Sequence, residues 1–449
     1  MRLIRPALAA LAVLTCAVAA GSAPAAAQRT YATGAALCDS YPRAPIEMAP
    51  GMCAGIVITP KAGEFAKRPL KMPRTLLPLP GGRDWVVIDM GGWGDGQGSV
   101  WKLTAEKGKA PQLKRLLSGL TMPHGLGRGP DGAVYVGEMS RIFRFDPLAA
   151  DPKATVAYVV QGLPDNKLHL NRHPLSHFVF DGNGDLLVNV GAPSDQCLKA
   201  GKPNALPGSG RCAESEGQEL TAGLRRYRYL GNGRWSPEYR MFARGLRNSL
   251  ALAWHPSGTL LQAENSIDYP EATRPFEELN ELVEGAHYGW PYCFDMDRAA
   301  PAWKAQRFMP CGSPAHTKPA TLLPPHSAPL GMLYYDGRMF PQLKGRLLIS
   351  LHGYREAGAR IIAFDVDAQG LPVVKPGAKY PVYAAGGRVD LRGYPAPAAE
   401  FRVLTPGWDM KPGVRPMGTP VGMAMAEDGA IWVAEDKNGV ILRIAAERR

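Results

Sequence analysis

A histidine placed directly before a strand is the first candidate for chemistry in this chain. His173 lies in the segment RHPLSHFVFDGNGDLLVNVGAPSD, residues 172–195, where a His, Pro and Ser cluster precedes an alternating apolar run. Because the ordinary pKa of imidazole lies near neutral pH, a histidine in such a place suits a general base. The alternative is a loop histidine that bonds only to backbone, and the choice depends on how the rest of the chain repeats around it.

Other polar residues recur at equivalent places in similar segments. They are His124, Arg247 with Asn248, His352 and Arg415. The sequence contains no GxSxG nucleophile, no GxxxxGKS phosphate loop and no GxGxxG after a strand. A redox or hydrolytic site with a non-nucleotide cofactor or a metal is the chemistry that remains.

The elements that must position these residues are repeated strand pairs. Six segments share a Gly or Pro start, an apolar strand, a turn of Asp, Asn, Gly or Ser, and a second strand; they begin at Leu77, Pro123, His177, Asn248, Ala328 and Val421. Turns of the PDG, GNG and EDG kind between β-rich runs indicate hairpins. Recurrence at intervals of about 50 residues or more is typical of propeller blades. We predict an all-β, six-bladed propeller in one domain over residues 28–449, in which equivalent positions point to one axis.

Helical periodicity is scarce, and its best candidate is the short segment FEELNELVEG, which starts at Phe276. Two long inserts, 192–222 and 264–327, interrupt the repeats. Loops of such length inside a compact domain are usually functional. We expect both inserts to rise from one rim of the propeller and to wall a site over its central channel.

The N-terminus predicts export. Arg2 and Arg5 precede an apolar run and a small-residue stretch, which is typical of a secretory signal over residues 1–27, cleaved after Ala27. No other segment is apolar for long enough to span a membrane. The mature protein is therefore expected in a periplasm. The net charge of +12 comes from scattered basic residues, which favours anionic ligands or acidic partner proteins over nucleic acid.

Six cysteines follow the signal segment, an even number that suits disulfides in an oxidising compartment. They form three close pairs in sequence, and local pairing needs the least assumption: Cys38 with Cys53, Cys197 with Cys212, and Cys293 with Cys311. Fifteen connectivities are open in principle. A zinc site is the rival interpretation, but the spacings lack close CxxC pairs, and no CxxCH is present for haem.

Several segments together resemble the soluble quinoprotein glucose and sorbosone dehydrogenases. The likeness spans nearly the whole mature chain, and its most specific motifs are RGLRN, ELN followed by HYGWP, and SLHG, in this order. The resemblance implies a six-bladed propeller that holds pyrroloquinoline quinone (PQQ) and calcium over its axis. Its implied reaction is oxidation of a sugar at the anomeric or aldehyde carbon, with electrons leaving to a periplasmic acceptor.

The resemblance also implies roles for particular residues. His173 matches the catalytic base of the family, and Arg247 with Asn248 match its RN pair beside the cofactor carbonyl. His352 and Arg415 fall where the family contacts the cofactor carboxylates, and we place His124 with these cofactor contacts.

Calcium is expected beside the main-chain carbonyls of Ser266 and Ile267, which match the family's ligands. Glu264, Asn265 and Asp268 are neighbouring oxygen donors of the kind that calcium prefers. The alternative is an ordinary polar turn in a solvated loop.

The chain departs from the glucose-oxidising branch at three places. Arg172 precedes the base at a position where that branch has an acid, and His352 stands where that branch has a lysine. Of the pair of arginines that the branch has late in its sequence, only one is clearly matched here, by Arg415. These differences favour the sorbosone-like branch. Aromatic and polar residues that could line a sugar pocket, or instead pack a blade, are Trp290, Tyr292, His326 and Tyr354.

Two other functions compete with this interpretation. A propeller lactonase or other metal-dependent hydrolase would activate water at the same rim, but it would need several inward acidic ligands, whereas the axis positions here are mainly His, Arg and Asn. The second competing interpretation is a propeller that binds sugar without catalysis, since a fold alone does not determine activity. The sequence leaves a homodimer open.

Overall fold

The computed structural model describes residues 31, 33–61, 64–164, 171–198, 210–217, 220–353, 355, 357–375, 381–384, 387–390, 398–408 and 418–447. The predicted signal segment 1–27 lies outside these residues, as do Tyr354 and Arg415. In the part of the chain that is described, no helix is long and apolar enough to cross a bilayer.

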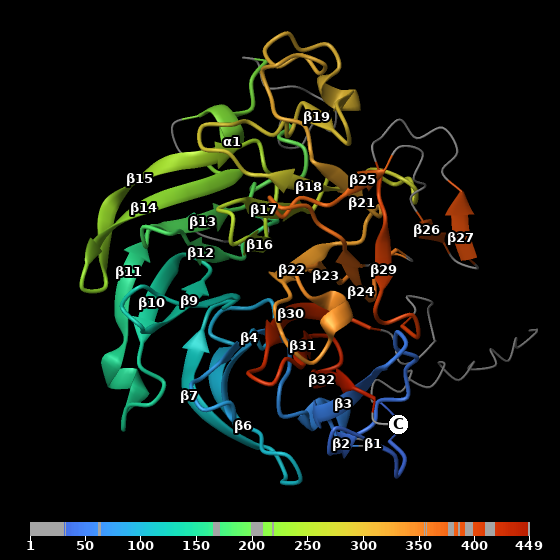
Figure 1. The fold of residues 1–449 in the computed structure, drawn as a ribbon. Coiled ribbons are helices and arrows are strands. Elements are labelled where there is room, and N and C mark those ends of the chain that lie inside the picture. The colour runs from blue at the N-terminus through green and yellow to red at the C-terminus, as the bar shows by residue number, and fades with distance from the viewer. Residues whose placement is uncertain are drawn as a thin grey trace, which may run out of the picture.

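Six four-stranded antiparallel sheets form the molecule, and they are arranged as the blades of a propeller (Figure 1). Blades 1 to 3 are built from β4 (Pro73–Pro78), β5 (Asp84–Asp89), β6 (Gly98–Thr104) and β7 (Gln112–Leu120); β8 (Gly125–Arg128), β9 (Val134–Glu138), β10 (Arg141–Phe145) and β11 (Ala157–Gln161); and β12 (Phe178–Phe180), β13 (Leu186–Val190), β14 (Gly223–Gly231) and β15 (Arg234–Arg244).

The other three blades take strands from more distant parts of the chain. They are built from β16 (Ala251–Trp254), β17 (Leu260–Glu264), β18 (Glu277–Glu281) and β21 (Thr321–Leu323); β22 (Pro329–Tyr334), β23 (Leu347–Leu351), β24 (Arg360–Phe364) and β29 (Phe401–Val403); and β30 (Pro420–Met425), β31 (Ile431–Glu435), β32 (Val440–Ala446) and β3 (Met52–Ile58).

The first strand of each blade lies at the hub. The strands β4, β8, β12, β16, β22 and β30 contact one another in this order, and β30 contacts β4, so the ring is closed. Each of the six segments predicted from the repeats supplies the first strand of one blade or its end, followed by the second strand. The prediction of a six-bladed, all-β propeller is therefore confirmed.

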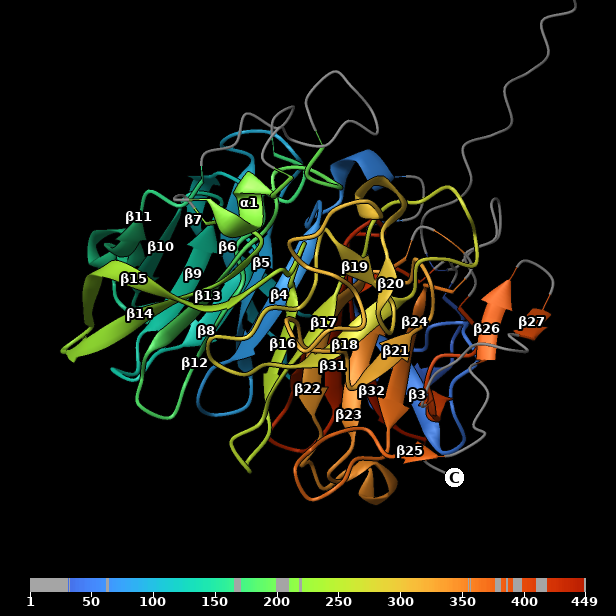
Figure 2. The ribbon, with the colours of Figure 1, turned by 90° about the horizontal axis from the view of Figure 1, so that it is seen from above.

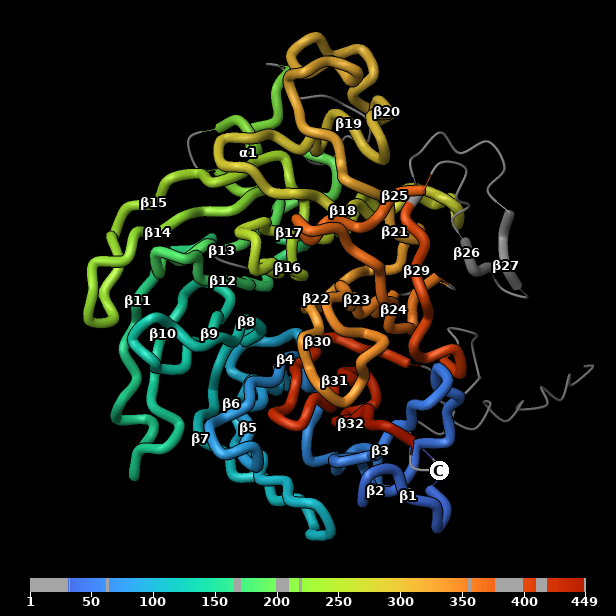
Figure 3. The backbone as a smooth tube through the Cα atoms, viewed as in Figure 1, coloured from blue at the N-terminus to red at the C-terminus, as the bar shows by residue number. Residues whose placement is uncertain are grey.

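The last blade joins the two ends of the chain. Strand β3, near the N-terminal end, pairs antiparallel with the C-terminal β32 in a register that sets Met52 opposite Ala446 (Figure 3). This pairing satisfies the backbone groups of two strands that would otherwise be open edges. The Cys38–Cys53 disulfide ties β3 to a small hairpin of β1 (Leu37–Cys38) and β2 (Tyr41–Pro42).

Apolar side chains fill the spaces between blades. Trp85 of blade 1 and Trp432 of blade 6 stack with ring centroids 4.3 Å apart. At the hub, all six blades contribute apolar side chains to a common cluster: Met72, Met90, Met122, Met139, Leu175, Leu250, Leu330 and Val421. Met72, Leu175, Leu250 and Leu330 of this cluster also line the cavity described in the next subsection.

The helix candidate from Phe276 is wrong. Residues 277–281 form β18, which pairs with β17 so that Leu261 lies opposite Glu281. Pairing and burial inside a blade outweigh the three-residue spacing of its apolar side chains. Among the described residues the only α-helix is the single turn α1 (Ala213–Glu216). The remaining short elements are β19 (Cys293–Phe294), β20 (Arg298–Ala299), β25 (Val374–Lys375), β26 (Pro381–Ala384), β27 (Gly387–Asp390), β28 (Ala398–Ala399) and the 3-10 turns Phe65–Lys67, Pro152–Thr155, Pro301–Trp303 and Pro341–Leu343.

The two long inserts pack on one another at one side of the ring, where α1 and the β19–β20 hairpin lie (Figure 2). Both inserts contribute to one apolar cluster, which includes Cys197, Cys212, Trp290, Tyr292 and Trp303. The disulfides Cys197–Cys212 and Cys293–Cys311 close one loop in each insert. All three predicted pairings are confirmed.

The stack of Trp85 on Trp432 should contribute strongly to stability because both rings are buried. We expect Trp85→Ala to lower the free energy of unfolding by about 3–5 kcal/mol, the usual cost of removing a large core side chain. Trp93 is the matched control, since its side chain is 48% exposed, and Trp93→Ala should cost no more than about 0.5 kcal/mol. Urea unfolding followed by circular dichroism measures both, and equal losses would contradict the prediction.

Candidate functional site

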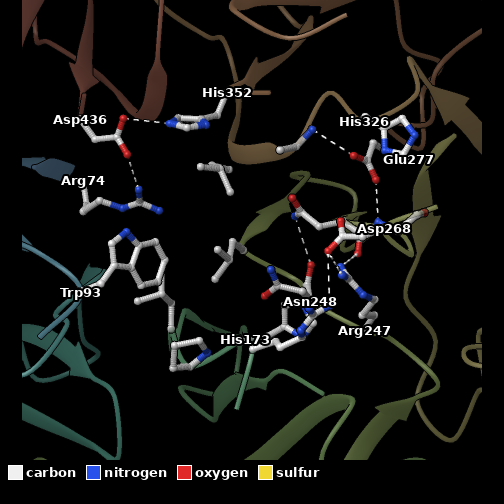
Figure 4. A pocket seen from close by; sticks show the side chains of 18 of the residues that line it. Arg74, Trp93, His173, Arg247, Asn248, Asp268, Glu277, His326, His352 and Asp436 are labelled. Atoms are coloured by element: carbon white, nitrogen blue, oxygen red, sulfur yellow. Dashed lines mark hydrogen bonds and ion pairs between the residues drawn. The ribbon is translucent and has the colours of Figure 1, made fainter. Parts of the chain in front are cut away.

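A cavity of about 420 Å³ lies over the hub, within the size range of ligand pockets. Five blades supply its polar wall: Arg74 from β4, His173 before β12, Arg247 before β16, His352 after β23 and Asp436 after β31. Figure 4 shows Arg247 and Asp268 on one side of the cavity and Arg74, His352 and Asp436 on the other. Segments far apart in sequence therefore meet at one place.

The structure brings together most of the residues predicted for the site. His173, Arg247, Asn248, Ser266 and His352 all line the cavity, as do Asn265, Asp268 and His326. The cavity lining does not include His124, Ile267, Trp290 or Tyr292. Trp290 and Tyr292 are instead buried in the cluster that joins the inserts, so the packing alternative holds for them.

His173 is held in a single tautomer. Its Nδ1 lies 2.5 Å from the carbonyl oxygen of Ala192, and because a carbonyl only accepts, Nδ1 must carry the hydrogen. The neutral ring then has a free lone pair on Nε2. Burial, and next the positive charge of Arg247, hold the pKa of His173 well below its usual range. At neutral pH the side chain is therefore an unprotonated base.

The backbone around His173 leaves little freedom. Its N–H donates to Oδ1 of Asn171 at 2.9 Å. A Cβ atom on Gly191, just after β13, would lie 2.6 Å from both the Cβ and the carbonyl oxygen of His173. Only glycine permits this close approach, which brings the Ala192 carbonyl to the imidazole ring.

Arg247 is a buried cation held between the two inserts. Its Nε and Nη2 donate to Oδ1 of Asp195 at 3.0 and 2.7 Å, and Nη2 also donates to Oδ2 of Asp268 at 3.0 Å. Nη1 donates to the carbonyl of Asn265 at 2.8 Å. Burial alone would lower the pKa of Arg247, but Asp195 and Asp268 raise it, so the guanidinium stays charged.

Asn248 presents an amide to the cavity without a partner. Its backbone N–H donates to Oε1 of Glu264 at 2.8 Å, whereas its Oδ1 is buried and has no hydrogen bond within the described ranges. Burial raises the pKa of Glu264 to about 7. A buried polar atom without a partner is costly. This oxygen can only accept a hydrogen bond, so only the side-chain nitrogen of Asn248 could donate to an anionic ligand in the cavity.

The opposite wall is a chain of polar contacts. Nε2 of His352 lies 2.8 Å from Oδ1 of Asp436, and Nη1 of Arg74 donates to the other Asp436 oxygen at 2.7 Å. Nε of Arg74 donates to Nδ1 of His124 at 3.2 Å. Burial alone would raise the pKa of Asp436, but His352 and Arg74 outweigh it and hold that pKa far below its usual range. His124 thus lies behind Arg74 and reaches the cavity only through it.

Oxygen donors gather at the predicted calcium position. Ser266 lines the cavity, and its N–H donates to Oε2 of Glu277 at 2.6 Å. Burial raises the pKa of Glu277 to about 7. Ile267 is buried, and its carbonyl accepts a hydrogen bond from the N–H of Tyr269 at 2.9 Å. This donor set is of the type that calcium binds.

Sequence reasoning missed Arg74, Asp195, Glu277, Asp436 and Trp93 as parts of the site or its support. One sequence signal was available. An acidic residue ends the second strand of four blades, and each of these carboxylates accepts a backbone N–H that precedes the first strand of its own blade: Asp89 from Met72, Glu138 from Thr121, Glu264 from Asn248, and Glu435 from Thr419. In these four blades the acid marks the end of the second strand, beside the segment that leads into the first strand.

The fold and the site define a six-bladed propeller with a cavity at its hub that is lined by polar side chains from five blades. The model of the family described as Glucose / Sorbosone dehydrogenase matches residues 154–369, a stretch that includes His173, Arg247, Ser266 and His352. This match confirms the resemblance indicated by the motifs.

Solved structures share the fold at low identity. The calcium structure of a Trichoderma reesei enzyme of Carbohydrate-Active Enzymes Family AA12 is 18% identical, with 92% of this chain and 99% of that chain covered and a TM-score of 0.61. The holo PQQ domain of pyranose dehydrogenase from Coprinopsis cinerea is 19% identical, with 91% and 99% covered and a TM-score of 0.58. The PQQ-bound aldose sugar dehydrogenase from Streptomyces coelicolor is 18% identical, with 89% and 100% covered and a TM-score of 0.54.

A curated relative is an uncharacterised protein of Borreliella burgdorferi, 30% identical over 135 residues, which is 28% of this chain. The match spans 34% of that protein, so this chain covers about a third of its length.

The neutral state of His173 should appear in the pH dependence of stability. The unfolded chain protonates this histidine near pH 6.5, whereas the folded protein resists protonation, so the free energy of unfolding falls as the pH drops below about 6.5. His173→Gln removes this contribution, and the wild type should lose up to about 1.4 kcal/mol more per pH unit than the variant. Urea unfolding between pH 7.5 and 5.5 measures the difference, and parallel curves would refute it.

The two carboxylates on Arg247 should differ in energetic weight. The side chain of Asp195 is 12% exposed and that of Asp268 is 54% exposed. We expect Asp195→Asn to cost about 3 kcal/mol or more, because it leaves a buried charge poorly paired, and Asp268→Asn to cost less than about 1 kcal/mol. Thermal unfolding of the two variants tests the order, and a larger loss for Asp268→Asn would reverse the assignment.

Proposed function

We propose that this protein is a periplasmic quinoprotein sugar dehydrogenase that oxidises an aldose or a sorbosone-like sugar with PQQ as its cofactor. The observation that carries the proposal is the unprotonated Nε2 of His173 at a hub cavity that it shares with the Arg247–Asn248 pair. The family match over the same residues supports it.

The residues present fit an anionic quinone. Arg247 offers a charged guanidinium, Asn248 a side-chain amide whose nitrogen can donate, and His352 an imidazole on the opposite wall. We assign these three side chains, with Arg74, to the binding of PQQ. Arg415 lies outside the described residues, and its role as a carboxylate contact stays a prediction. We assign to His124 the positioning of Arg74. When bound, PQQ supplies an electrophilic carbonyl carbon that accepts hydride from the sugar.

His173 provides the proton transfer. Its Nε2 takes the hydroxyl proton of the sugar, which makes loss of hydride from the same carbon easier. The Nδ1–H bond to Ala192 keeps the ring oriented and stabilises the positive charge that the ring gains. The positive charge of Arg247 steadies negative charge that develops close to it.

Calcium is assigned to the carbonyls of Ser266 and Ile267, with the nearby carboxylate of Glu277. A divalent cation there would offset the cost of burying Glu264 and Glu277, whose pKa values burial raises to about 7. As a Lewis acid it would polarise an oxygen of a bound ligand. The Trichoderma reesei relative was solved as a calcium structure, which is consistent with this assignment.

The periplasmic assignment depends on the predicted signal segment and is supported by the three disulfides, which persist in oxidising compartments. The electrons are expected to pass from the cofactor to a periplasmic acceptor. His352 and Arg172, the departures from the glucose-oxidising branch, favour the sorbosone-like branch of the family and leave the sugar itself open.

The test is reconstitution of the purified protein with PQQ and calcium, followed by dye reduction with a panel of aldoses and sorbosone. His173→Gln should lower kcat by about 10²- to 10⁴-fold, the usual contribution of a placed base, while quenching of tryptophan fluorescence by PQQ persists. Arg247→Ala should impair both the rate and the quenching.

Two results would contradict the proposal. Full activity of His173→Gln would remove the assigned base, and hydrolysis of lactones without quinone would identify a hydrolase. PQQ binding without oxidation of any sugar would favour a propeller that only binds sugars.

A further inference from the structure

Arg172 lies at the mouth of the cavity, next to the base. Its side chain is 60% exposed, whereas His173 is 9% exposed. Of these two consecutive residues, Arg172 therefore lies at the open end of the cavity and His173 in its buried wall. The backbone N–H of Arg172 donates to the carbonyl of Pro193 at 2.9 Å, which fixes its position. Arg172 directly precedes His173 in the chain, and its positive charge adds to burial and Arg247 in lowering the pKa of His173.

The guanidinium of Arg172 is poorly paired. Its Nη1 lies 4.0 Å from Oδ2 of Asp268, too far for a hydrogen bond, and that oxygen already accepts from Arg247. Among the described residues no hydrogen bond to the Arg172 guanidinium is present. By contrast, Arg74 is bound to Asp436, and Arg247 to Asp195. The planar guanidinium of Arg172 therefore has N–H groups free to donate beside His173, and their geometry suits a carboxylate or a phosphate.

Trp93 provides an apolar surface at the same mouth. It lines the cavity and is 48% exposed. The loop that carries Trp93 packs closely around the side chain of Gln97. A Cβ atom on Gly92 would lie 2.1 Å from the Gln97 amide oxygen, and one on Gly94 would lie 2.2 Å from the amide nitrogen. The N–H of Gly91 donates to Asp89 at 3.1 Å. The tryptophan is thus carried on a tightly wrapped loop and can cover the apolar face of a sugar ring.

We infer that the substrate is an anionic sugar, whose carboxylate or phosphate binds Arg172 while its reacting hydroxyl meets His173 and its ring lies on Trp93. The inference depends on the proposed function and adds the substrate class. Arg172 is a specificity-determining residue in it. The buried Arg247 and His352 serve the cofactor, because they lie in the wall of the cavity, whereas Arg172 lies where a sugar enters.

The experiment compares glucose, glucuronate and glucose 6-phosphate on the reconstituted holoenzyme. At low ionic strength the wild type should favour at least one anionic sugar over glucose by about tenfold or more in kcat/KM, since a charge-assisted hydrogen bond has that weight. The preference should shrink in high salt because the mouth is exposed. The two anionic sugars distinguish a carboxylate from a phosphate.

Arg172→Gln should lower the ratio of kcat/KM for the preferred anionic sugar over that for glucose at least tenfold. The matched control is Arg83→Gln, which removes an equally exposed arginine, 63% exposed, that pairs with Glu106 and does not line the cavity. This control should leave the ratio unchanged. Trp93→Leu should weaken neutral and anionic sugars alike.

Calorimetric binding of the same sugars to the protein without turnover gives a second readout. Tighter binding of the anionic sugar that is lost in Arg172→Gln supports the inference even if turnover is slow. Equal binding and equal kcat/KM for glucose and both anionic sugars would overturn it, while oxidation of glucose would leave the proposed function standing. Loss of PQQ quenching in Arg172→Gln with an unchanged sugar ratio would also overturn it, because Arg172 would then serve the cofactor.

Discussion

The buried guanidinium of Arg247 is the interaction on which the site depends. A charge taken out of water must be paired and hydrogen-bonded, or it costs several kcal/mol. Its partners come from different places: Asp195 from one insert, Asp268 from the other, and the Asn265 carbonyl from the end of β17. Arg247 can therefore be buried only when both inserts are folded over the hub.

The same arrangement holds the base. Ala192, whose carbonyl accepts from His173, is the first residue of the insert that also carries Asp195. The Ala192 N–H donates to the carbonyl of Arg247 at 2.8 Å. The disulfides and the shared apolar cluster join the two inserts. Base, cation and inserts are therefore one structural unit, although His173 and Arg247 belong to different blades.

The hub contains both buried, hydrogen-bonded carboxylates and a cluster of apolar side chains. Carboxylates at the ends of second strands hold the segments that enter four of the blades, and some of them are buried enough that their pKa rises to about 7. Apolar side chains from all six blades form one cluster at the hub, and several of them line the cavity. The cavity at the hub therefore has both an apolar surface and a polar wall.

The repeats, the disulfide pairs and the residues that meet at the hub were predictable from the sequence, because turn chemistry, strand alternation and short cysteine spacing are local properties. The supporting residues were not. Asp195, Asp436 and Arg74 gain their roles from contacts across 52 and 362 positions of the chain, and the segment from Phe276 became a strand through pairing with β17. The sequence by itself determined the blade repeat and brought His173 and Arg247 forward as residues of one site, which turn and strand patterns placed at the hub. Only the tertiary structure decided which carboxylates pair with which cations, which imidazole nitrogen is free and which arginine is left at the mouth, because burial and hydrogen bonding depend on segments that meet only when the ring closes.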